Sequence, residues 1–211
     1  MITSIKSSFL DYKMTILRNK KTSNSLFRQT MNESSYLIAA EVLKHLSFKK
    51  VNIHTPLTKT TGKDLAQQII LVPILRAGLG LLEGFVKFLP NAEKGHIGLY
   101  RDEQTYEPVE YLFKLPKTTN KKVLVLDPML ATGNSSIAAI NLIKNKGVNI
   151  KDVFLVSLLA APEGIKNLEK AHRSLHIFTC QIDAKLNKKK FYYWLILKWL
   201  QGSMVNGNQE S

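Results

Sequence analysis

The chain has 211 residues, a length that fits one domain with a sizeable core. Hydrophobic residues make up 45% and charged residues 22%, which is the range of ordinary soluble globular proteins and excludes a low-complexity chain. The formal net charge of +14 favours anionic partners such as phosphorylated small molecules, nucleic acid or an acidic membrane surface. A surface that is merely rich in lysine explains the charge equally well.

The cysteine count and the apolar segments indicate the cellular compartment in which the protein is expected. The one cysteine, Cys180, excludes an intramolecular disulfide framework and a Cys/His metal cluster built on it, so we expect a buried structural residue. The N-terminus lacks the unbroken apolar run of a secretory signal. The apolar stretch at residues 191–200 is shorter than the roughly 20 residues that span a bilayer. We therefore expect a cytoplasmic protein that does not use a membrane.

The first half of the chain predicts helices and buried strands. Residues 23–46 carry apolar side chains at helical spacing and are predicted to form one or two helices. Residues 49–63 indicate a short edge strand and a polar turn. The continuous apolar run at 68–75 predicts a strand buried on both faces, followed by a Gly-containing turn and a helix within 76–89. Residues 96–116 predict a strand, a charged excursion and a returning strand.

The second half continues the alternation of buried strands and amphipathic helices. In chain order the predicted elements are strand 121–127, helix 136–147, strand 152–161, helix 162–172 and strand 175–183. Strands that alternate with helices of this length are typical of an α/β protein with a mostly parallel, doubly wound sheet. We predict one such domain over residues 1–211.

The stretch DPMLATGNSS, residues 127–136, predicts an anion site. It follows a buried strand, and ligands of such sheets bind at the carboxyl ends of the strands. Its small residues allow backbone N–H groups to converge near a helix N-terminus, an arrangement that favours a phosphate. The hydroxyls of Thr132, Ser135 and Ser136 are candidate additional donors. The stretch is neither a Walker P-loop nor a G-x-G-x-x-G motif.

Asp127 opens this stretch, and its carboxylate would repel a phosphate. It therefore suits a neighbouring group, either the hydroxyls of a ribose or a bound Mg²⁺. The alternative is an ordinary strand–turn–helix connection in which local N–H groups satisfy the carboxylate.

Two arginines follow other predicted strands. Arg76 lies between the strand at 68–75 and its Gly-bearing turn, where a guanidinium and backbone amides together suit a diphosphate. Arg101 follows a strand in the sequence GLYRDE. Each arginine alone is also compatible with a surface ion pair. Three strand-end anion sites in one sheet together favour a ligand that carries phosphate groups.

These segments resemble those of the uracil phosphoribosyltransferase family. VPILRAGLGLLEG, HIGLYRDEQTYEPVEYLFKLP, VLVLDPMLATGNSS and LLAAPEGIKNLEKAH match that family in order and spacing, over residues 6–187. The run Asp-Pro-Met-Leu-Ala-Thr-Gly is specific to it among phosphoribosyltransferases. The resemblance implies the type I phosphoribosyltransferase fold with a small hood or arm. It also implies transfer of ribose 5-phosphate from phosphoribosyl diphosphate (PRPP) to uracil, giving UMP and diphosphate in pyrimidine salvage.

The resemblance also implies roles for the candidate residues. Asp127 would contact the ribose hydroxyls, Arg76 with Ala77 and Gly78 would form the diphosphate loop, and Arg101 would reach the diphosphate from a flexible arm. Asp127, Arg76 and Arg101 are thus the candidate catalytic residues. Pro128 is a further candidate PRPP-binding residue. The turn that would hold PRPP by its 5′-phosphate consists of Met129, Leu130, Ala131, Thr132, Gly133, Asn134 and Ser135.

The family also implies a cofactor and an assembly. Its members use Mg²⁺ bound mainly through PRPP, so we expect no metal site made by the protein. They are usually dimers or larger, and some are activated by GTP, which implies a homodimer or higher oligomer and a GTP effector here.

The resemblance ends after Asn187. The family continues with a segment resembling Gly-(Tyr/Phe)-Ile-Ile-Pro-Gly-Leu-Gly-Asp-Ala-Gly-Asp-Arg, which recognises uracil, whereas residues 188–211 form a divergent tail. The uracil-binding residues are therefore unassigned, and Tyr192 is the nearest aligned position. The tail is either the product of a reading-frame slip in a codon run rich in A, or a genuine amphipathic ending. In both cases we expect PRPP binding with little or no transfer to uracil.

Two other functions remain open at this point. One is a non-catalytic regulator that binds PRPP or a nucleotide and has affinity for RNA, although the lysines and arginines are scattered instead of forming one stripe. The other is a phosphoribosyltransferase for another base, which the divergent tail would permit.

Overall fold

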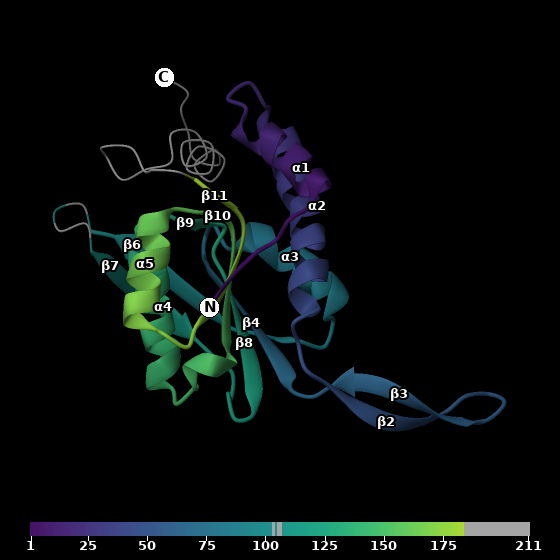
Figure 1. Cartoon of the computed structure of the whole chain (residues 1–211). Coiled ribbons are helices and arrows are strands. Elements are labelled where there is room, and N and C mark those ends of the chain that lie inside the picture. The colour runs from purple at the N-terminus through teal and green to yellow at the C-terminus, as the bar shows by residue number, and fades with distance from the viewer. Residues whose placement is uncertain (103, 105–106, 184–211) are drawn as a thin grey trace, which may run out of the picture.

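The computed structural model describes residues 1–102, 104 and 107–183, which form a mixed sheet between two layers of helices (Figure 1). Along its main path the strands are β1 (Ile2–Ser4), β11 (His176–Ile182), β10 (Val153–Ala160), β8 (Lys121–Leu126), β4 (Gln68–Leu75), β6 (His96–Arg101) and β7 (Pro108–Lys114). The short strands β5 (Glu93–Lys94) and β9 (Met129–Leu130) pair with β4 and β10. Of these pairings, only β6–β7 is antiparallel among the described residues. The prediction of a mostly parallel sheet is confirmed.

Helices cover both faces of this sheet, as a doubly wound fold requires. One face is covered by α1 (Ser8–Arg18), α2 (Asn24–Leu43) and α3 (Leu79–Phe88), and the other by α4 (Asn134–Asn145), α5 (Pro162–Ala171) and the short 3₁₀-helix η1 (Ile150–Asp152). The region predicted as one or two helices is thus one helix, α2. It begins where the Ser23 hydroxyl accepts a hydrogen bond from the Leu26 N–H at 3.3 Å.

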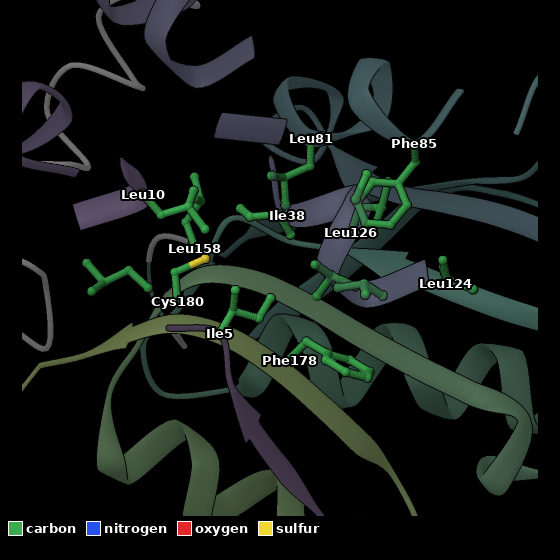
Figure 2. Packing of buried hydrophobic residues seen from close by; sticks show 14 of the residues in the cluster. Ile5, Leu10, Ile38, Leu81, Phe85, Leu124, Leu126, Leu158, Phe178 and Cys180 are labelled. Atoms are coloured by element: carbon green, nitrogen blue, oxygen red, sulfur yellow. The ribbon is translucent and has the colours of Figure 1, made fainter. Parts of the chain in front are cut away.

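The core is divided by the sheet because successive side chains of a strand point to opposite faces. In β8, Leu124 and Leu126 pack with α1–α3, and Figure 2 shows them beside Phe85 of α3. Val123 and Val125 pack on the other face with α4 and α5. These four side chains of β8 are fully buried, which explains the apolar run that follows the two lysines at the start of the strand.

Residues 48–65 differ from the expected edge strand. They form a separate antiparallel hairpin of β2 (Phe48–His54) and β3 (Lys59–Leu65), which projects from the body of the molecule (Figure 1). The turn is closed by the Thr55 N–H, which donates to the Thr58 carbonyl at 2.9 Å. The prediction of an edge strand was wrong because β2 and β3, in which polar residues alternate, pair with each other and not with a strand of the main sheet.

Cys180 is buried at 7% exposure in the core beside α1, which confirms its structural character (Figure 2). Burial raises the pKa of its thiol to about 12, so the thiol remains protonated and unreactive. None of the helices formed by the described residues is both long and apolar enough to cross a bilayer.

Candidate active site

The three strand ends singled out by the sequence meet at one edge of the sheet. Strands β8, β4 and β6 are neighbours, and β4 runs parallel to both of the others. Asp127 follows β8, Arg76 follows β4, and Arg101 is the last residue of β6. Because the carboxyl ends of parallel strands share an edge, the loops that carry these residues converge there.

The loop after β4 is packed tightly against the end of β8. It turns at Gly78, whose N–H donates to the carbonyl of Ile74 at 2.8 Å, and the peptide bond between Leu75 and Arg76 is cis. A Cβ atom on Gly78 would lie 2.3 Å from the carbonyl oxygen of Leu126 and 2.7 Å from the nitrogen of Ile74. Only glycine allows this approach. Arg76 is exposed, and the loop holds it next to the end of β8, which Asp127 follows.

Asp127 is 8% exposed and is held from three directions. Its N–H donates to the Val156 carbonyl of β10 at 3.0 Å. Its Oδ2 accepts a hydrogen bond from the Ser136 hydroxyl at 2.9 Å, and its Oδ1 accepts a long one of 3.5 Å from the Met129 N–H. A carboxylate has about four acceptor positions, so acceptor capacity remains for a ligand. A single long bond to a local N–H does not satisfy the group.

The electrostatic setting of Asp127 follows from this burial. Desolvation raises the pKa of its carboxyl from the ordinary 3.8 to about 6, while the hydrogen bonds from Ser136 and Met129 act in the opposite direction. The group is therefore ionised at neutral pH, and an ionised acceptor makes strong hydrogen bonds with hydroxyl groups.

The loop from Pro128 to Thr132 is anchored through its carbonyl groups. The Pro128 carbonyl accepts from the N–H groups of Leu158 and Leu159, at 3.0 and 3.2 Å, and the Leu130 carbonyl accepts from the Ala161 N–H at 2.8 Å. The Thr132 carbonyl accepts from Asn167 Nδ2 of α5 at 3.0 Å. These bonds fix the loop against β10 and α5 before any ligand arrives, which reduces the entropic cost of binding.

Helix α4 begins directly after this loop. Its N-cap is Gly133, which has a φ of +86° and provides no side chain to cap the first turn. The N–H groups of the first turn of a helix lack intrahelical partners, and the helix dipole places partial positive charge there. The loop and the first turn of α4 thus form a cradle suited to a phosphate.

Comparisons with known proteins identify the family of the chain. A sequence model of the uracil phosphoribosyltransferase family matches residues 4–193. The chain belongs to this family. It is 47% identical over 190 residues to the uracil phosphoribosyltransferase of Streptococcus mutans, covering 89% of this chain and 90% of that one. The enzyme of the same name from Lactococcus lactis subsp. lactis is 44% identical over 186 residues, covering 87% and 88%.

Solved structures confirm the phosphoribosyltransferase fold. A protein from Aquifex aeolicus superposes with a TM-score of 0.84 at 34% identity, covering 90% of this chain and 91% of that one. A purine phosphoribosyltransferase from Pyrococcus horikoshii gives a TM-score of 0.50 at 13% identity, covering 74% and 84%. The second likeness concerns the fold alone.

The structure gives one candidate donor a partner within the protein and adds a residue to the site. The hydroxyl of Ser136, named from the sequence as a candidate donor to a phosphate, donates to Asp127. Gly164 was not singled out, yet a Cβ on it would lie 2.4 Å from the Ala131 carbonyl oxygen, so it lets α5 approach the cradle. A glycine in the first turn of a helix was the available signal, because glycine disfavours helix. The tail 188–211, including Tyr192, lies outside the described residues.

A hollow of about 620 Å³ at the foot of the hairpin is not part of this site. It is lined by Lys49 and by residues 64–69, 88–92 and 119–120. These residues belong to the hairpin, to the start of β4, to the end of α3 with the loop that follows it, and to the loop before β8, so the hollow lies near the amino ends of the central strands. The phosphate cradle lies at their carboxyl ends.

Gly164→Ala is expected to displace the cradle. Alanine favours helix over glycine by about 1 kcal/mol, but the 2.4 Å contact with the Ala131 carbonyl forces the loop or α5 to move. We expect a net loss of about 1–2 kcal/mol of stability and weaker binding of inorganic phosphate, measured by urea unfolding and calorimetric titration. Gly62→Ala in the hairpin, where the nearest atom lies at 3.4 Å, is the control. Unchanged stability and phosphate binding in Gly164→Ala would contradict the contact's role.

Proposed function

We propose that the chain is built to transfer ribose 5-phosphate from PRPP to uracil, giving UMP and diphosphate for pyrimidine salvage, and that its divergent tail impairs the transfer step while PRPP binding is kept. The observation that carries the proposal is the convergence of Asp127, Arg76 and Arg101 on three neighbouring parallel strands. PRPP has a ribose, a 5′-phosphate and a diphosphate. The loop after β8 suits the ribose and the 5′-phosphate, and the residues at the ends of β4 and β6 suit the diphosphate.

The ribose 5-phosphate half of PRPP is assigned to the loop after β8. The Asp127 carboxylate accepts hydrogen bonds from the ribose hydroxyls, and its low exposure strengthens them. The N–H groups between Met129 and Ser135, with the hydroxyls of Thr132 and Ser135, hold the 5′-phosphate at the start of α4. Pro128 and Leu130 support this turn through their anchored carbonyls.

The diphosphate is assigned to Arg76 and Arg101. Breaking the bond between C1 and the diphosphate develops positive charge on the ribose and negative charge on the leaving group. The Arg76 guanidinium and the backbone of Ala77 and Gly78 stabilise that negative charge, as does Arg101 from the end of β6. Holding uracil N1 in line with C1 lowers the barrier further.

Mg²⁺ fits this site as a group carried by the substrate. The cradle and the arginines offer N–H, hydroxyl and guanidinium donors, which bind phosphate oxygens. The metal would thus be held mainly by oxygens of PRPP, as Mg²⁺ commonly is in phosphate-binding enzymes. When bound, it neutralises charge on the departing diphosphate.

The proposal extends to assembly and regulation, on the family resemblance alone. It includes a homodimer or larger oligomer, a GTP effector and a cytoplasmic location. Sedimentation of the purified chain and titration of activity with GTP test the first two.

The divergent tail leads to a specific expected result. The family match ends at residue 193, and about a tenth of the length of the curated relatives lies outside the matched region. A site that hydrogen-bonds its substrate loses several kcal/mol when those donors and acceptors are replaced. We expect calorimetry to show PRPP binding in the presence of Mg²⁺, while an assay of UMP formation on the same sample shows little or no product.

Arg76→Ala is the matched control for this experiment and should weaken PRPP binding strongly. Absence of PRPP binding in the unaltered chain would overturn the proposed function. Full production of UMP would show that another segment recognises uracil. Because the family match stops at residue 193, transfer to a different base is the second candidate, and product analysis with a panel of pyrimidine and purine bases separates the two.

A further inference from the structure

The hydroxyl of Ser136 donates a hydrogen bond to the carboxylate of Asp127. Ser136 lies in the first turn of α4, is 1% exposed, and its Oγ lies 2.9 Å from Oδ2 of Asp127. The Met129 N–H, at 3.5 Å from Oδ1, is a much weaker restraint on the same carboxyl. The orientation of the Asp127 side chain therefore depends mainly on Ser136.

The Ser136 hydroxyl departs from the usual pattern of a helical serine. Such a serine commonly donates to the carbonyl four residues earlier, which for Ser136 is that of Thr132. The Thr132 carbonyl accepts from Asn167 Nδ2 at 3.0 Å, whereas the Ser136 hydroxyl donates to Asp127. The hydroxyl of Ser136 bonds to Asp127 and thereby closes the loop between β8 and α4.

We propose that Ser136 is a positioning residue that sets the Asp127 carboxylate relative to the 5′-phosphate cradle, so that one ligand engages both. The inference rests on the proposed function, in which Asp127 binds the ribose and the first turn of α4 binds the phosphate. Ser136 belongs to that same turn, so its hydrogen bond ties the two parts of the site together across nine residues of sequence.

A positioning role predicts different effects on two ligands, whereas a general structural role predicts the same effect on both. A ligand that contains both a ribose and a phosphate depends on the alignment of the two parts, whereas phosphate alone depends only on the cradle. Losing the Ser136 hydroxyl should therefore weaken the first ligand and spare the second. The hydroxyl also opposes the effect of burial on the pKa of Asp127, so its loss should raise that pKa further.

The experiment is calorimetric titration of the full chain with ribose 5-phosphate and, separately, with inorganic phosphate. In Ser136→Ala we expect ribose 5-phosphate to bind about tenfold to a hundredfold more weakly, the range for a hydrogen bond to a charged group, with phosphate unchanged. The acidic loss of ribose 5-phosphate binding should move to higher pH. Ser136→Cys keeps a weaker donor in place, and we expect an intermediate affinity.

Ser34→Ala is the matched control. Ser34 is also a buried helical serine, but its hydroxyl donates to the Thr30 carbonyl at 2.7 Å within α2, so this variant should bind both ligands normally. Equal affinity of Ser136→Ala and the unaltered chain for ribose 5-phosphate would overturn the inference alone. Equal weakening of both ligands would also overturn it, by indicating a general structural role. If the unaltered chain binds neither ribose 5-phosphate nor PRPP, the proposed function itself fails.

Discussion

Asp127→Asn is expected to weaken PRPP binding by about a hundredfold and, at the same time, to stabilise the ligand-free protein at neutral pH. Hydrogen bonds to a charged group contribute about 1.5–3 kcal/mol each, and asparagine replaces the ionised acceptor by a neutral group with a single carbonyl oxygen. Asn is nearly the same size and can still accept from Ser136, so the loop keeps its packing. The weaker binding and the higher stability have the same cause: Asp127 is a charged group that is only 8% exposed, which destabilises the ligand-free fold and strengthens hydrogen bonds to the ligand.

The stabilisation follows from the sign of the pKa change. Burial raises the pKa of Asp127 from 3.8 to about 6, so the folded state holds this proton more tightly than the unfolded state does. The carboxyl therefore contributes stability below about pH 4, and this contribution is lost as the pH rises through about 6. Above that pH the ionised group costs the fold about 3 kcal/mol, an order-of-magnitude figure from the difference between the two pKa values. Asparagine carries no such cost.

Urea unfolding between about pH 4 and about pH 8 measures this effect. The stabilities of the unaltered chain and Asp127→Asn should lie close together near pH 4 and separate by about 1–3 kcal/mol above pH 6, with the variant more stable. Asp64→Asn in the hairpin is the matched control, since it changes the charge equally at a side chain that is 62% exposed. An Asp127→Asn protein that is less stable at pH 8, or that binds PRPP as tightly as before, would contradict this account.

The arrangement of the site was largely predictable because its elements carry strong local signals. Strand 68–75 was expected from an unbroken apolar run and is found as β4 with those bounds. A strand that is buried on both faces of a parallel sheet is apolar at nearly every position, and this continuous run is easy to recognise in the sequence. Once the strands are parallel, the residues that follow them must share an edge, so Arg76 and Asp127 were expected to come together.

What the sequence did not reveal depends on contacts between distant segments. Ser135 and Ser136 are the same residue type in the same turn. Only the fold of the loop determines that Ser136, and not Ser135, donates a hydrogen bond to Asp127. The Gly164 contact requires the position of α5 relative to Ala131, which no local pattern specifies. The hairpin was misread for a similar reason. Alternating polar residues between 48 and 65 indicate strands but do not say which strand is their partner.

Gly78→Ala is expected to have the largest effect on both the fold and the site among the glycine variants considered. The backbone of Gly78 has φ −60° and ψ −20°, which alanine adopts readily, so the effect is one of space alone. The added Cβ would lie 2.3 Å from the Leu126 carbonyl and 2.7 and 2.8 Å from the backbone of Ile74. These atoms belong to two central strands, β8 and β4, and cannot move aside as a flexible side chain does. We expect a loss of about 2–4 kcal/mol of unfolding free energy in urea.

The same displacement should separate Arg76 from Asp127, because the two residues follow the strands that the new Cβ would push apart. PRPP, which must reach both loops, should then bind at least about tenfold more weakly in calorimetry, even under conditions where the variant is folded. Gly62→Ala adds the same methyl group at a position whose nearest atom is 3.4 Å away, and should leave both stability and PRPP binding nearly unchanged. If Gly78→Ala matched Gly62→Ala in both measurements, the close packing of the loop against β8 could not be what positions the diphosphate site.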